Sequence, residues 1–216
     1  MSRRIWLLLL IAPLLAGCGA GLKEEGRLPF SNPLGRSAGE TMEMLVGTAP
    51  ASRNGGAVTR QATANYTGSF ANASSNVTIG NVRRFLICQR IQSAQVQVPE
   101  GAPLPSTITM NNFHLNATFS DNQAQVTFNV SVTGTVTLTR TTGNNYAVTV
   151  QGAGPDPCLG ATVESGNLNT LAQIVTQGGN NIVQVTLRAN VTSSPGLPDG
   201  SRILLTTGLG TGTLEL

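Results

Sequence analysis

The feature that most constrains the fold is a strict alternation of apolar and polar residues between Ala124 and Leu138. Apolar residues occupy the even positions and polar residues the odd ones, and only Gly134 interrupts the apolar row. Because successive side chains of a β-strand point to opposite faces, this pattern predicts a strand with one apolar and one polar face. These 15 residues would span about 50 Å at ~3.4 Å per residue, so we expect the strand to bend at Gly134.

Similar patterns recur along the chain and predict an all-β domain. Clusters of Gly, Pro, Asn and Asp, which favour turns, separate the segments. A strand with one apolar face must bury that face, so we expect an antiparallel β-sandwich or an incomplete barrel. The expected strands lie at 62–70, 77–88, 94–98, 108–110, 113–119, 124–138, 146–150, 183–191, 203–206 and 212–216.

Three local signals refine this expectation. Residues 141–145 contain Gly-Asn-Asn, which favours a hairpin turn directly after the long strand. The apolar row changes phase at Asn111-Asn112, which predicts a bulge or a corner. Apolar residues between Leu168 and Val175 are spaced three, one and three apart, so they predict one short helix that ends at Gly178-Gly179.

The composition argues against a nucleic-acid-binding role. Charged residues make up 11% of the chain and aromatic residues 4%, which is typical of β-structure with a neutral polar outer face. The formal charge is +3, but without Arg3 and Arg4, in a segment that we expect to be removed, 11 basic residues face 10 acidic ones, or +1. Arg83-Arg84 is then the only adjacent basic pair, whereas a nucleic-acid-binding protein needs a basic cluster.

Residues 1–17 have the organisation of a secretory signal peptide. Two arginines precede an apolar run from Ile5 to Leu15, and small residues follow. The run is too short to span a bilayer as a stable helix. We therefore expect this segment to direct export and to be cleaved.

The end of the segment, Leu15-Ala16-Gly17-Cys18, resembles the lipobox of bacterial lipoproteins. In that family the cysteine thiol receives diacylglycerol, the chain is cut before the cysteine, and the new amine is acylated, as with palmitate. The resemblance implies that Cys18 is a lipidation site and that the membrane is a partner, since two or more acyl chains hold a protein stably. Gly19 stands where Asp would favour inner-membrane retention, which implies the outer membrane, facing the periplasm.

The chain then divides into a tether and a domain. Residues 18–58 are expected to be the lipidated N-terminus and a flexible tether, because Gly, Ala, Ser, Pro and Arg recur there without apolar periodicity. A segment that docks on the sheet is the alternative. Residues 59–216 are expected to form the β-rich globular domain.

Cys88 and Cys158 are the two cysteines that remain if Cys18 is lipidated. An even pair in an exported protein favours a disulfide, with two separate buried thiols as the alternative. The bridge would close a loop of about 70 residues, which contributes roughly 4 kcal/mol in the chain-entropy model.

The sequence contains no catalytic or metal-binding motif. The single histidine, His114, lies between the apolar residues Phe113 and Leu115, so it is expected to point outward with Asn116 and Thr118. The chain lacks both Gly-X-Ser-X-Gly and Cys-X-X-Cys, and the six acidic residues of the expected domain are isolated, mostly in turns or at ends. We predict no enzymatic activity, no cofactor and no metal.

These observations predict a lipid-anchored cell-envelope protein that acts as a non-catalytic binding or structural module, with an envelope protein as its partner. The alternative is a periplasmic carrier that holds an apolar or lipid ligand in a curved sheet, which the length of the strand at 124–138 suggests. A transmembrane barrel is also built from alternating strands, but such barrels carry aromatic girdles and this chain has few aromatic residues.

Overall fold

The computed structural model describes residues 26–47, 52–54, 56–73, 80–152, 158–177 and 179–216. These residues form 12 strands and one helix, so the all-β prediction is confirmed. The strands are β1 (Arg27–Ser31), β2 (Thr41–Val46), β3 (Ser52–Asn54), β4 (Ala57–Ser69), β5 (Arg84–Gln97), β6 (Thr107–Ser120), β7 (Gln125–Val132), β8 (Thr135–Arg140), β9 (Asn145–Gln151), β10 (Leu159–Val163), β11 (Ile182–Ser193) and β12 (Arg202–Glu215), and the helix is α1 (Leu168–Gln177).

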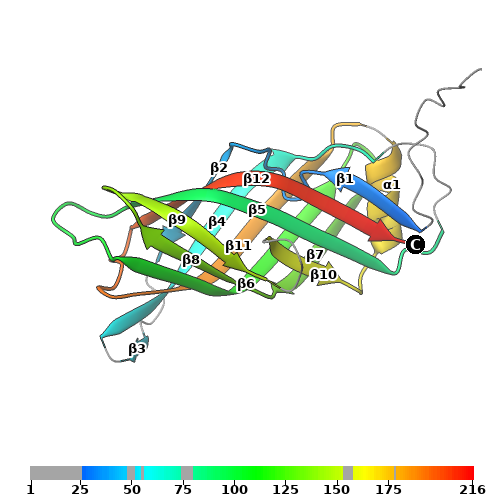
Figure 1. Ribbon diagram of the computed structural model, residues 1–216. Coiled ribbons are helices and arrows are strands. Elements are labelled where there is room, and N and C mark those ends of the chain that lie inside the picture. The colour runs from blue at the N-terminus through cyan, green and yellow to red at the C-terminus, as the bar shows by residue number, and fades with distance from the viewer. Residues whose placement is uncertain (1–25, 48–51, 55, 74–79, 153–157, 178) are drawn as a thin grey trace, which may run out of the picture.

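Eight of the strands form a closed antiparallel barrel (Figure 1). Around the ring they follow the order β12, β2, β4, β11, β6, β8, β9 and β5, and pairing of β5 with β12 closes it. The sequence predicted either a sandwich or an incomplete barrel, and the structure is a barrel whose ring is complete. The remaining strands add to this wall: β1 pairs with β12, β3 with β4, β7 with β6 and β10 with β5.

Different strands form the barrel wall at its two ends. Strand β6 pairs with β8 through residues 107–110 and with β7 through residues 113–120. Strand β12 likewise pairs with β2 through residues 202–206 and with β1 through residues 211–215. One end of the barrel is therefore built with β2, β8 and β9, and the other end with β1, β7 and β10.

The long alternating segment bends where it was expected to bend. Gly134 has a φ of +141°, and it separates β7 from β8. Both strands pair with the same edge of β6, so they act as one interrupted strand in which the apolar phase is kept. The hairpin of β8 and β9 and the helix α1 also confirm the sequence-based expectations.

The N-terminal segment differs from the expected flexible tether. Residues 27–31 pair with β12, and residues 41–46 pair with both β12 and β4, so residues 27–46 belong to the barrel wall. The loop between them is tied to β12 as well, because Gly39 donates to the carbonyl of Thr207 at 2.7 Å. Docking on the sheet, the alternative interpretation, describes this part of the segment, and the folded domain includes residues 27–46, which lie before the expected boundary at residue 59.

A very close backbone contact holds the β1–β2 loop against β4. A Cβ atom added to Gly68 would lie 2.0 Å from the carbonyl oxygen of Gly35. A Cβ on Gly35 would likewise lie 2.8 Å from the Cα of Gly68. Because only glycine lacks this atom, the two glycines let the loop lie directly on the strand.

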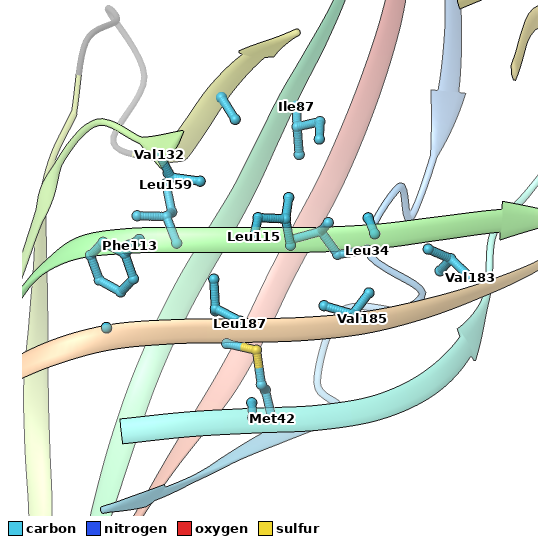
Figure 2. Close-up of a cluster of buried hydrophobic side chains, with 14 of the residues drawn as sticks. Leu34, Met42, Ile87, Phe113, Leu115, Val132, Leu159, Val183, Val185 and Leu187 are labelled. Atoms are coloured by element: carbon cyan, nitrogen blue, oxygen red, sulfur yellow. The ribbon is translucent and has the colours of Figure 1, made fainter. Parts of the chain in front are cut away.

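Large apolar side chains fill the interior of the barrel. Figure 2 shows side chains from β2, β5, β6 and β11 converging on the same space, among them Met42, Ile87, Leu115 and Leu187. Each of these four is at most 5% exposed. An eight-stranded barrel is just wide enough for its inward side chains to fill it, and this interior is packed in that way.

Aromatic rings concentrate in the half of the barrel that contains β1 and β7. Phe30, Phe70, Phe85, Phe119 and Phe128 have neighbouring ring centroids 5.4–6.1 Å apart. The helix α1 lies at this end (Figure 1), where it packs against β7 and β6, and its apolar face is buried. This helix therefore covers one end of the barrel.

Candidate functional site

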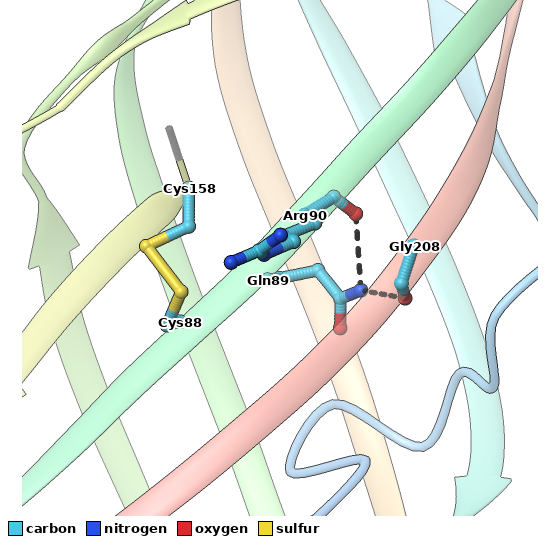
Figure 3. Close-up of a disulfide and its surroundings, with 5 residues drawn as sticks. All are labelled: Cys88, Gln89, Arg90, Cys158 and Gly208. Atoms are coloured by element: carbon cyan, nitrogen blue, oxygen red, sulfur yellow. Dashed lines mark hydrogen bonds between the residues drawn. A yellow bond between two sulfur atoms is a disulfide. The ribbon is translucent and has the colours of Figure 1, made fainter. Parts of the chain in front are cut away.

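Of the three site residues predicted from the sequence, the structure describes two and joins them. Cys18 lies outside the described residues. Cys88 of β5 and Cys158, which directly precedes β10, form the expected disulfide, with their Cα atoms 5.4 Å apart (Figure 3). Because β10 pairs with β5 from Leu159 onward, the bridge links the two strands next to the start of that pairing.

A buried glutamine next to the disulfide was missed by sequence reasoning. Gln89 is 2% exposed and points into the barrel, and its Nε2 donates to the carbonyl of Gly208 at 3.0 Å (Figure 3). The pairing of β12 with β5 shifts register at this point, between Thr207 and Gly210. The side-chain amide thus donates to a backbone carbonyl at the irregular part of the strand pairing, which is a structural role.

Asp121 and Asp199, two of the acidic residues that the structure describes, serve local structure. Asp121 accepts hydrogen bonds from the backbone amides of Gln123 and Ala124 at 2.7 and 2.6 Å, which is the geometry of a turn former. Asp199 pairs with Arg60. Within the described ranges, no group of three His, Cys, Asp or Glu side chains is placed to hold a metal ion.

The structure does bring together an extensive polar surface on the outside of the barrel. Four neighbouring strands, β7, β6, β11 and β4, each present an outward polar residue at three successive positions. We call these twelve exposed or half-buried residues the polar grid. Its rows are Ser131–His114–Arg188–Thr63, Asn129–Asn116–Thr186–Asn65 and Thr127–Thr118–Gln184–Thr67.

Hydrogen bonds between side chains order the polar grid. Asn116 donates from its side-chain amide to Asn129, and Thr186 donates to Oδ1 of Asn65 at 2.8 Å. The hydroxyls of Thr118 and Thr127 lie 2.9 Å apart. Such cross-strand pairs stabilise the sheet and fix the rotamers, so the remaining donors and acceptors are held in defined directions.

The polar grid is hollowed into two shallow grooves. The larger has a volume of about 430 Å³ and is lined by residues that include His114, Asn129 and Arg188. The second, of about 360 Å³, runs over β4 and β11. Asn116 and Thr186 line both grooves, so the two are neighbours on one surface.

An irregularity in the ladder shapes the first groove. The pairing of β11 with β6 shifts register between Arg188 and Asn190, and Asn112 on β6 has a φ of +51°. This is the bulge that the phase change at Asn111-Asn112 predicted. A bulge bends its strand and redirects the adjacent side chains, and here those are His114 and Arg188 at the first row of the polar grid.

The electrostatics of the polar grid rest on one residue. Arg188 is the only Arg, Lys, Asp or Glu among its twelve members. Its guanidinium makes no hydrogen bond or ion pair with another residue in the part of the chain that the structure describes. His114, which lies beside it, points outward as expected.

Comparison with known proteins assigns no family. No protein-family model matches the chain, and no curated protein matches it at a significant level. Among the described residues, no helix has the length and apolar character needed to cross a bilayer.

Proposed function

We propose that this chain is a lipid-anchored protein of the bacterial cell envelope whose barrel acts as a non-catalytic binding or structural module. The observation that carries this proposal is the contrast between the two faces of the wall. The inner face is packed with apolar side chains, whereas the outer face of four strands presents ordered, neutral polar groups. A partner would therefore bind to the outer face of the barrel.

The filled interior gives the alternative, a carrier of an apolar ligand, no support. A carrier of this size keeps the centre of its eight-stranded barrel open for one small ligand. Here Met110 and Leu187, each at most 1% exposed, fill the interior outside the phenylalanine cluster. The five clustered phenylalanine rings occupy the helix-covered half in the same way.

The position of β1 supports attachment close to the membrane. Seven residues lie between Cys18 and Gly26, so the eight steps of chain from one to the other span at most about 29 Å. Gly26 accepts a hydrogen bond from Leu216 at 2.7 Å, so the start of β1 and the end of β12 lie together, at the end covered by α1 (Figure 1). A lipid on Cys18 would hold this end towards the bilayer and leave the side of the barrel with the polar grid accessible.

The sequence around the lipobox favours the outer membrane as the site of the anchor, with the barrel in the periplasm. Gly19 lacks the carboxylate that favours inner-membrane retention in the lipoprotein family. The disulfide between Cys88 and Cys158 fits this location, because such bonds persist in the oxidising periplasm.

Mass spectrometry and detergent partition of the full chain, expressed in a Gram-negative host, test the proposal. The wild type should lack residues 1–17, carry the added mass of a diacylglycerol and one acyl chain on Cys18, and enter the detergent phase. Cys18→Ser should lose the added mass and remain in the aqueous phase, while Cys88→Ser serves as a control for the loss of a cysteine. A wild-type protein cleaved elsewhere and free of lipid would overturn the anchor.

A further inference from the structure

The chemistry of the polar grid identifies a class of ligand. Its rows consist of Asn, Gln, Thr and Ser side chains, and an amide or hydroxyl group can donate and accept hydrogen bonds at the same site. A sugar hydroxyl has the same dual character. The two adjacent grooves, which share Asn116 and Thr186, provide room for an extended chain of such groups.

The charge pattern narrows this class further. Arg188 is a cation that lacks a carboxylate partner among the described residues, and no acidic residue belongs to the polar grid. A guanidinium matches the planar geometry of a carboxylate and pairs with it through two parallel hydrogen bonds. The ligand therefore carries a carboxylate close to hydroxyl-rich units.

Other classes of partner fit this surface less well. Protein interfaces depend on buried aromatic and apolar anchors, and none of the twelve grid residues is aromatic except for the imidazole of His114. Nucleic acids require several cations along a phosphate backbone, and the polar grid supplies one arginine.

We infer that the polar grid binds a polysaccharide whose sugars carry carboxylates. Arg188 pairs with a sugar carboxylate in the first groove, and the amide and hydroxyl rows bond to the hydroxyls of neighbouring sugars. This inference rests on the proposed role as a binding module and gives that role its ligand class. It does not depend on the lipid anchor.

Titration calorimetry of the full chain with oligogalacturonate, and with neutral dextran oligomers as a comparison, tests the inference. Wild-type protein should bind oligogalacturonate more tightly than dextran, and added salt should weaken the difference. Arg188→Gln should weaken oligogalacturonate binding about tenfold or more, because a charge-assisted hydrogen bond is lost. Arg202→Gln is the matched control, since that arginine is exposed on β12 and lies outside the polar grid.

A second pair of variants tests the hydroxyl rows without changing charge. Thr186→Val keeps the shape of the side chain, removes the hydroxyl from both grooves, and should weaken binding of both kinds of oligosaccharide several-fold. Thr137→Val on β8, outside the polar grid, should have no effect. Circular dichroism and thermal melting of each variant establish that it is folded.

The results separate this inference from the anchor. Absence of oligosaccharide binding by folded wild-type protein would overturn the ligand assignment, and so would equal binding of dextran that Arg188→Gln leaves unchanged. Binding of single-stranded DNA with the same dependence on Arg188 would also overturn it, because charge alone would then suffice. Detergent partition reports on Cys18 only and is independent of all these outcomes.

Discussion

The side-chain amide of Gln89 donates a hydrogen bond to the backbone carbonyl of Gly208 inside the barrel, at 3.0 Å. A Cβ on Gly210 would lie 2.5 Å from Oε1 of the same side chain, so the glycine makes room for the amide. The contact lies where β12 shifts register against β5. It shows how the barrel accommodates an irregular strand without leaving that carbonyl unpaired.

Replacing this glutamine tests the arrangement. Gln89→Leu should lower the free energy of unfolding by about 1–3 kcal/mol, because the buried carbonyl of Gly208 loses its donor. Urea denaturation followed by circular dichroism measures the change. Gln97→Leu, at an exposed position of the same strand, should stay within roughly 0.5 kcal/mol of wild type. Equal effects of the two substitutions would contradict a structural role for the amide.

The disulfide should stabilise the barrel through the unfolded state. The bond closes a loop with a sequence separation of 70, so its reduction should lower the unfolding free energy by roughly 4 kcal/mol. Thermal melting with and without reductant measures this loss. The double variant Cys88→Ser and Cys158→Ser should melt at the lower temperature under both conditions. A wild-type melting temperature that reductant does not change would refute the prediction.

The contact of the β1–β2 loop with β4 predicts a strongly position-dependent effect of alanine. Gly68→Ala should destabilise the protein by about 1–3 kcal/mol or more, since its Cβ collides with the carbonyl oxygen of Gly35 and neither backbone can yield alone. In Gly47→Ala the nearest atom is 4.0 Å from the new Cβ, so this variant is the control. Chemical denaturation of both variants compares them, and a Gly68→Ala protein as stable as Gly47→Ala would disprove the close contact.

Tyr66 links stability to alkaline pH. Burial raises the pKa of its hydroxyl, an effect that the nearby Arg36 guanidinium only partly offsets, and the hydroxyl has no hydrogen-bond partner among the described residues. Above pH ~10 the unfolded chain loses a proton that the folded protein keeps, so the unfolding free energy falls as pH rises. Below that pH the group contributes no pH dependence.

Tyr66→Phe should therefore reduce the alkaline loss of stability and leave stability at pH 7 unchanged or higher by about 1 kcal/mol. Tyr146→Phe is an informative comparison, because the Tyr146 hydroxyl donates to the carbonyl of Pro105 at 2.7 Å. That variant should be less stable at pH 7 by about 1 kcal/mol. Denaturation curves between pH 7 and 11 measure these changes. An unfolding free energy that falls more steeply with pH in Tyr66→Phe than in wild type would contradict the role assigned to the Tyr66 hydroxyl.

Most of the strands were predictable because each buries one face. The long segment with the bend at Gly134, the β8–β9 hairpin and α1 all follow from local periodicity. The N-terminal strands were harder to find for local reasons. In β2 the apolar side chain of Leu45 is 50% exposed, and it obscures the alternation of Met42, Met44 and Val46. Strand β1 has only five residues, and one of them is Pro29.

The candidate site was predictable only in part. The outward direction of His114, Asn116 and Thr118 follows from the phase of the apolar residues beside them. The polar grid, however, depends on β11 lying between β4 and β6, although β4 and β11 are more than 100 residues apart in the sequence. Single-strand periodicity contains no information on that neighbourhood, so the placement of Arg188 beside His114 required the assembled barrel.

The pairing of β12 with β1, β2 and β5 has a consequence for biogenesis. Because β12 closes the ring and follows the other described strands in the sequence, a partly synthesised chain that lacks it cannot complete the barrel. The wall gains its closing strand only when residues 202–215 arrive, and most of its pairings are non-local, which slows folding. If the chain is exported as proposed, this topology would delay folding and keep the polypeptide able to pass through a narrow channel until residues 202–215 are available.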